Sequence, residues 1–169
     1  YIIVIELASW HQASEYAGAM TLGSNTGYLA RIDSSRENKA ILNAVMNHLS
    51  EEQLEQTLAE DGSIAPFIWL GGSDADAEGI WIWSNNGDQF WRGDFNGFGV
   101  ADRFINWGVQ PDSATGDEDA LAMGLDDWPE PFFDLGAAGQ WNDLDVDTRL
   151  MYVMEFDGTP DLRVAIEEP

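Results

Sequence analysis

The sequence contains no cysteine, and its 169 residues include only seven lysines and arginines. Without cysteine the chain can form no disulfide, no thiolate metal site and no thiol nucleophile. So few cations cannot form a basic track along a nucleic-acid backbone, and we therefore expect no nucleic-acid partner. The same shortage disfavours binding to an anionic membrane surface.

Long hydrophobic runs are also missing. The apolar segment near the start of the chain, residues 2–5, is too short to span a bilayer, and no targeting segment is recognisable. We therefore predict no membrane insertion. Because the sequence has no initiator methionine, we expect an excised module or a mature fragment, and we predict that it is part of a larger multidomain protein.

Acidic and aromatic residues are abundant instead. The 31 aspartates and glutamates give a formal net charge of −24, while 44% of the residues are hydrophobic and eight are tryptophan. This apolar content excludes a disordered acidic tail. No internal repeat, linker or low-complexity segment divides the chain, so residues 1–169 are predicted to form a single domain.

Hydrophobic periodicity predicts an α+β fold. Strands are predicted for short apolar segments: 2–7, 28–32, 67–71, 80–83, 150–156 and 163–166. Helices are predicted for 10–22 and 36–49, with a further helical turn or two within 50–61. Most of 84–139 is rich in glycine, aspartate and aromatic residues and is predicted to be irregular, and loops of such length usually carry function.

Carboxylate and amide side chains concentrate in three segments, 74–78, 110–119 and 141–143. Hard cations such as calcium take about 6–8 oxygen ligands of this kind. By composition alone, acidic loops are more often simply solvated. The spacing within these segments favours a cation site.

At these residues the chain resembles the C-type lectin-like domain family. The similar segments are Trp69-Leu70-Gly71-Gly72, Glu78-Gly79, 104–107, Gln110-Pro111-Asp112, Glu118-Asp119 and Trp141-Asn142-Asp143. Upstream, 10–17, 27–30 and 37–38 resemble the first helix, the following link and the second helix of the family. The resemblance covers nearly the whole chain and implies the C-type lectin-like fold, with two main helices, small antiparallel sheets and a long calcium-binding loop region.

The resemblance also implies a principal Ca²⁺ site that doubles as the carbohydrate site. Its ligands would be Gln110, Asp112, Glu118, Asn142 and Asp143. Two vicinal sugar hydroxyls would complete the coordination, donating hydrogen bonds to carboxylates and accepting them from carboxamide nitrogens. In the family the bond before the central proline is cis, so we predict a cis Gln110–Pro111 bond. The cis isomer costs little free energy when the following residue is proline.

The Gln-Pro-Asp order resembles the galactose-preferring branch of the family. Ser113 follows the motif where galactose binders usually carry a nearby tryptophan, so galactose-type and fucose-type glycans both stay candidates. A few aromatic residues could form an apolar wall against which the sugar packs. For any one of them, packing within the loops is the more typical role. These residues are Trp91, Trp128, Phe132 and Phe133.

A second, structural calcium site is implied by Asp74 and Glu78, together with Glu118 and Asp119. Ser113 stands where family members with this site often carry an acid. A solvated acidic loop is the open alternative.

The missing cysteines distinguish this chain from animal members of the family, which usually have two disulfides. We predict that a tryptophan-rich core replaces them. Its expected members are Trp69, Trp81, Trp107 and Trp141. A cysteine-free form with loop insertions resembles bacterial modules of large surface adhesins.

The sequence thus predicts calcium-dependent carbohydrate binding that serves cell adhesion, in a secreted or cell-surface protein, because exchangeable calcium sites match extracellular calcium levels. One alternative is a lectin-like fold that binds a protein or peptide, with calcium only organising the loops. Another is a glycosidase that uses Asp117 and Glu118 as acid and base. We predict no enzyme, because Glu118 is already assigned to the metal. Arg92-Gly93-Asp94 matches the RGD tripeptide of integrin-type recognition, but a three-residue pattern is common by chance and carries little weight.

Overall fold

The computed structural model of the chain describes residues 1–60, 64–113, 117–130, 133–158 and 165–167. Its helices are α1 (Trp10–Ala19), α2 (Ser35–His48) and α3 (Glu51–Gln56). Its strands are β1 (Ile2–Ala8), β2 (Thr21–Leu22), β3 (Asn25–Leu29), β4 (Leu58–Ala59), β5 (Ala65–Ser73), β6 (Ile80–Trp83), β7 (Asp88–Arg92), β8 (Phe98–Gly99), β9 (Ala120–Gly124), β10 (Trp128–Glu130), β11 (Phe133–Gly136), β12 (Trp141–Leu144), β13 (Leu150–Phe156) and β14 (Ala165–Glu167).

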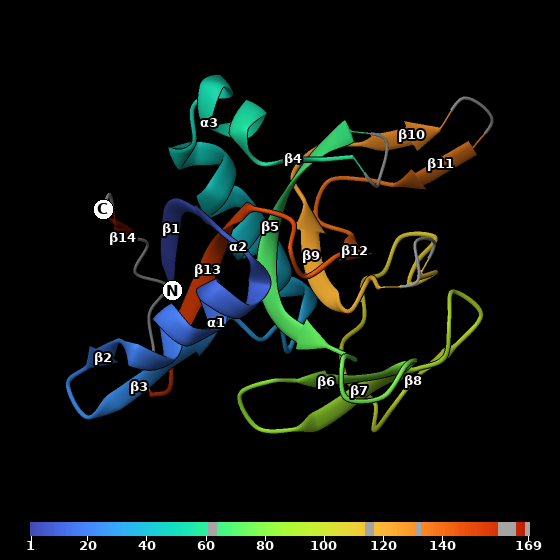
Figure 1. Ribbon diagram of the computed structural model, residues 1–169, viewed down its shortest axis with the longest axis horizontal. Helices are drawn as coiled ribbons and strands as arrows, with labels where there is room; N and C mark the ends of the chain where they lie inside the picture. The colour runs from blue at the N-terminus through green and yellow to red at the C-terminus, as the bar shows by residue number, and fades with distance from the viewer. Residues whose placement is uncertain (61–63, 114–116, 131–132, 159–164, 168–169) are drawn as a thin grey trace.

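The sheet is mixed, and in the described part of the chain one connected sheet holds all strands except the β10–β11 hairpin. β13 lies between β1 and β5, antiparallel to the first and parallel to the second. β14 also runs parallel to β1. The predicted α+β class is confirmed, but the small antiparallel sheets are joined into one, because β13 inserts between segments that would otherwise stay separate (Figure 1).

The two main helices cover opposite faces of this sheet. Along β5, Phe67 and Trp69 pack in the hydrophobic cluster that includes the buried face of α1, whereas Ile68 and Leu70 pack in the cluster that includes α2. Successive side chains of a strand point to opposite faces, so a run of apolar residues is buried on both sides. β5 is therefore a central strand, and it sets the position of its neighbours β9 and β6.

The predicted tryptophan core is confirmed. Trp69, Trp81, Trp107 and Trp141 are each no more than 8% exposed. The Trp141 indole Nε1 donates to Oδ1 of the buried Asn38 on α2 at 2.8 Å, and the amide of that asparagine donates to the Gly139 carbonyl at 2.9 Å. These bonds fix β12 against α2.

Several element boundaries differ from the prediction. The first helix ends at Ala19, because Gly23 adopts φ +65° and turns the chain so that Thr21–Leu22 pairs with β3. The strand predicted over 28–32 is shifted to Asn25–Leu29 for the same reason. The strands predicted over 80–83 and 150–156 have the observed bounds.

The segment 84–139 is more ordered than predicted: most of it lies outside strands, but β7 to β11 lie within it. β9 reads Ala-Leu-Ala-Met-Gly, and all five residues are buried between β5 and β12. A strand buried on both faces shows no alternation, and alanine and glycine have low strand propensity, so neither signal identified it.

None of the helices in the described part of the chain has the length and apolar character that a membrane-spanning helix requires.

Glu155 on β13 gives a test of the packing near α2. Its carboxylate accepts a hydrogen bond from the Arg31 backbone N–H at 3.1 Å, and burial, with a smaller contribution from the charge of Glu37, raises its pKa to about 7. Because the folded state holds this proton more tightly than the unfolded state, Glu155 destabilises the fold increasingly as pH rises from about 4.5 to about 7.

We predict that Glu155→Gln, which keeps an acceptor for Arg31, raises the melting temperature at pH 8 but changes it little at pH 5. Thermal melts of both proteins in metal-free buffer measure this difference. Glu6→Gln, at an exposed position of β1, is the matched control for the loss of one negative charge. An equal effect of Glu155→Gln at both pH values would contradict the assignment.

Candidate metal centre

Three strand ends meet at one edge of the sheet. β9 pairs antiparallel with both β5 and β12, with Ser73 opposite Ala120 and Asp143 opposite Leu121. The end of β5, the beginning of β9 and the end of β12 therefore lie side by side. This arrangement brings the residues after β5, before β9 and at the end of β12 together, and the Asp74 N–H donates to the Asp119 carbonyl at 3.3 Å.

The Gln110–Pro111 bond is cis, as predicted. The segment that follows is fastened to β12 by a single carboxylate. Oδ2 of Asp143 accepts from the backbone N–H groups of Asp112 at 3.0 Å and Ser113 at 2.9 Å. The long segment that carries Asp112 is thereby held against the sheet edge.

Three carboxylates converge at this edge. Asp112, Glu118 and Asp143 each offer an oxygen that lies within 4.8 Å of the oxygens of the other two. Glu118 and Asp143 are 2% and 1% exposed, whereas Asp112 is exposed. Carboxylates this close repel one another when ionised, so the cluster favours a proton or a cation among them.

Two buried amide side chains lie close to these carboxylates in the sequence. Gln110 is 3% exposed and Asn142 is fully buried. Within the described part of the chain, Gln110 Oε1 and Asp143 Oδ1 are buried and accept no hydrogen bond. A buried acceptor without a donor costs about 1–3 kcal/mol, and a bound cation would supply the missing partner. The oxygen donors present thus fit a hard cation.

Burial raises the pKa of Asp143 to about 8. The Ser113 N–H favours the ionised form, but the charges of Glu118 and Asp112 raise the pKa further. Asp143 therefore exchanges its proton near neutral pH, and a cation at its oxygens would displace that proton.

The second predicted group is less closely assembled. Asp74 is 3% exposed; its Oδ2 accepts from the Gly79 N–H at 2.7 Å, and its Oδ1 accepts no hydrogen bond among the described residues. Burial raises the pKa of Asp74 to about 7. Glu78 is exposed and Asp119 is half-buried. In the described ranges the carboxylate oxygens of these acids do not gather within 4.8 Å of one another as those of the first group do, so the second calcium site stays a prediction.

One cavity of about 250 Å³ connects the two groups. Asp74, Glu78, Asp112 and Asp143 all line it. Asp94 lines it too. No sequence pattern predicted this, because the position of Asp94 depends on the pairing of β7 with β6.

The hypothesis that Trp128 forms a wall of a sugar site is wrong. Trp128 is fully buried and packs edge-on against Phe67, with ring centroids 5.3 Å apart. Gly136 lies so close to the Trp128 ring that a side chain there would collide with it. Trp91 is half-buried, and the side chains of Phe132 and Phe133 lie outside the described residues.

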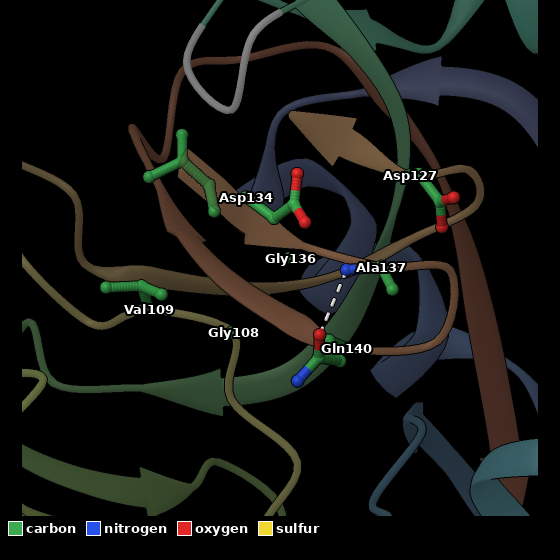
Figure 2. A pocket seen from close by; sticks show the side chains of 8 residues that line it. Gly108, Val109, Asp127, Asp134, Gly136, Ala137 and Gln140 are labelled. Carbon is green, nitrogen blue, oxygen red and sulfur yellow. Dashed lines mark hydrogen bonds between the residues drawn. The ribbon is translucent and has the colours of Figure 1, made fainter. Parts of the chain in front are cut away.

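A larger pocket of about 550 Å³ lies between the β10–β11 hairpin and Gly108–Val109. Asp127, Asp134 and Gln140 stand around it, and Gln140 accepts a hydrogen bond from the Ala137 N–H at 2.9 Å (Figure 2). None of the predicted metal ligands lines this pocket. Although this pocket is the larger of the two, it is therefore not where the predicted calcium and carbohydrate ligands lie.

No family model matches the sequence. Among curated proteins, the chain is 27% identical over 125 residues to halomucin of Haloquadratum walsbyi, a match that covers 72% of this chain. The chain spans about 1% of the length of halomucin.

Solved structures match over most of the chain. The C-type lectin CEL-I from Cucumaria echinata is 20% identical with a TM-score of 0.59, over 88% of this chain and 81% of that one. The C-type carbohydrate-recognition domain of cow CD23, solved in the presence of a GlcNAc2Man3 oligosaccharide, is 18% identical with a TM-score of 0.57, over 91% and 84%. Human lithostathine and a herring type II antifreeze protein match as well. These likenesses show that the chain has the C-type lectin-like fold.

Proposed function

We propose that this protein binds carbohydrate through a calcium ion held by Gln110, Asp112, Glu118, Asn142 and Asp143. The observation that carries the proposal is the convergence of three carboxylates within 4.8 Å, two of them buried, at the end of the cis Gln110–Pro111 segment. Two buried amides adjoin them in sequence.

Calcium is the cation that this donor set favours. Five side chains offer only oxygen ligands, and their mixture of carboxylate and carboxamide groups gives a formal charge of −3. Calcium accepts 6–8 such oxygens in adaptable geometry, whereas zinc prefers sulfur and nitrogen ligands in a closed tetrahedron. Magnesium demands a stricter octahedron and keeps several waters.

The exposed and buried ligands have different tasks. The exposed Asp112 is accessible to a ligand, so its carboxylate would accept hydrogen bonds from sugar hydroxyls. The amide of Gln110 would donate a hydrogen bond from its nitrogen. The buried Asp143 holds the Asp112 backbone in place. When bound, the ion would supply coordination positions for two vicinal hydroxyls, which allows neutral galactose-type or fucose-type glycans to bind without a deep pocket.

The comparisons support this proposal at the level of the fold. Several matched structures are C-type lectins or carbohydrate-recognition domains. Because the fold also occurs in lithostathine and an antifreeze protein, it does not itself select sugar binding. Support for carbohydrate as the ligand comes from Asp112 and Gln110, whose carboxylate and amide groups could hydrogen-bond sugar hydroxyls.

The biological setting follows from the calcium. Exchangeable calcium sites match extracellular calcium levels, so we propose a secreted or cell-surface location and a role in adhesion without catalysis. The match to a small part of halomucin is compatible with a module of a much larger protein.

Calcium should stabilise the fold. We predict that millimolar calcium raises the melting temperature above that in chelator, since a ligand at 100 times its dissociation constant contributes about 2.7 kcal/mol. Asp143→Asn should lose most of this increment, because it removes a buried charged ligand. Asp145→Asn, two residues further on at an exposed position, is the control and should keep it. Identical midpoints of the unaltered protein in calcium and in chelator would mean that these loops bind no metal.

Calcium affinity should depend on pH. Because the pKa of Asp143 is raised to about 8, its proton must leave before the carboxylate can bind the ion. We predict that the apparent calcium affinity falls by up to about tenfold per pH unit between pH 8 and pH 6 for each proton displaced. Calorimetric titrations with calcium at several pH values measure this, and an affinity independent of pH would contradict the role of Asp143.

Glycan binding should require calcium and Asp112. We predict that a glycan panel shows binding to neutral galactose-type or fucose-type structures in calcium and none in chelator. Asp112→Ala should lower the glycan affinity at least tenfold, which corresponds to roughly 1.4 kcal/mol of binding free energy. Asp117→Ala, at a nearby exposed acid, should bind as the unaltered protein does. Binding that survives chelation would overturn the coordination mechanism. Calcium binding without any glycan binding would favour a protein partner.

A further inference from the structure

Two large aromatic side chains remain exposed on one short loop. Phe95 and Phe98 are 53% and 62% exposed, whereas Phe67, Phe90 and Phe156 are at most 4% exposed. We call residues 93–98, which comprise the turn after β7 and the first residue of β8, the aromatic loop. Apolar side chains exposed together on a folded surface mark interaction sites more often than scattered single ones do.

The aromatic loop is held in one conformation by its own hydrogen bonds. The Trp91 indole Nε1 donates to the Gly93 carbonyl at 3.0 Å and to the Asp94 carbonyl at 3.3 Å. The N–H groups of Asn96 and Gly97 both donate to Asp94, to its carboxylate at 2.9 Å and its carbonyl at 2.7 Å. A side chain at Gly97 would collide with the Arg92 carbonyl. The two phenylalanines are thus presented by an ordered turn, so little entropy would be lost on binding.

The aromatic loop adjoins the acidic cavity. Gly93 and Asp94 line the same 250 Å³ cavity as Asp112 and Asp143. The Gly93 N–H donates to the Gly79 carbonyl at 2.8 Å, which fastens the loop to the segment after β5. Phe95 directly follows Asp94 in the chain, and Phe98 pairs with Arg92 across β7 and β8. The aromatic loop therefore borders the cavity through Gly93 and Asp94, and Phe95 is the next residue along the chain.

We propose that Phe95 and Phe98 form the apolar side of the glycan site and determine which sugars it accepts. This inference rests on the proposed function. A pyranose ring has hydroxyls at its edge and contiguous C–H groups on a face, so a sugar whose hydroxyls meet the acidic cavity can lay its C–H face on an aromatic ring. The carboxylates around the cavity repel anionic sugars, and the ligand class is accordingly neutral pyranosides.

The test is calorimetric titration of methyl galactoside and methyl fucoside in saturating calcium. Phe95→Ala and Phe98→Ala should each lower the affinity of the preferred glycoside by about two- to tenfold, the range expected for one aromatic contact. Calcium affinity, titrated separately, should stay unchanged. Phe95→Tyr should keep the affinity, because it retains the ring. Leu22→Ala, at a 50% exposed position on the distant β2, is the control (Figure 1).

Four results would overturn the inference. Glycoside affinities of both alanine variants equal to that of the unaltered protein would exclude contact with the sugar. A parallel loss of calcium affinity would mean that the loop acts through the metal ligands. If the alanine variants keep their glycoside affinity but lose self-association in sedimentation experiments, the loop is an interface between copies of this chain. If the unaltered protein binds calcium but no glycoside, the proposed function fails first, and this inference fails with it.

Discussion

The candidate site depends on one electrostatic constraint, which is the crowding of carboxylates at a buried sheet edge. Asp143 is 1% exposed, lies within 4.8 Å of two other carboxylates, and accepts two backbone hydrogen bonds that fix the segment carrying Asp112. Burial, with a smaller contribution from the charges of Glu118 and Asp112, raises its pKa to about 8. A fold that buries acids this way is best stabilised by a cation, and the position of the cation decides where a ligand can bind.

Much of this site could be predicted because its parts are local motifs. The cis Gln110–Pro111 bond and the tryptophan core followed from resemblance to a known family, and the strands 80–83 and 150–156 followed from apolar runs bounded by polar residues. Other features depend on tertiary pairing. β9 is an alanine-rich strand that only burial between β5 and β12 explains, and the fully buried Trp128 could not be distinguished in sequence from an exposed loop tryptophan. Asp94 reaches the cavity only because β6 and β7 form a hairpin.

The net charge of −24 divides into two parts with different physical roles. A few acids, among them Asp74, Glu118 and Asp143, are buried at the sheet edge, where their charge has a proposed counter-ion. Others, such as Glu51, Glu52 and Glu55, are exposed on α3. Two bound calcium ions would add +4 and change the formal charge only from −24 to −20. The remaining excess hydrates the surface and repels anionic partners, consistent with a neutral ligand.

The central claim is tested most directly by a crystal structure of the protein grown in calcium and soaked with a galactoside or fucoside. The account predicts one cation about 2.3–2.6 Å from oxygens of Gln110, Asp112, Glu118, Asn142 and Asp143, with two vicinal sugar hydroxyls completing its coordination. A calcium-saturated crystal with no ion among Asp112, Glu118 and Asp143, or with the sugar bound elsewhere, would contradict it.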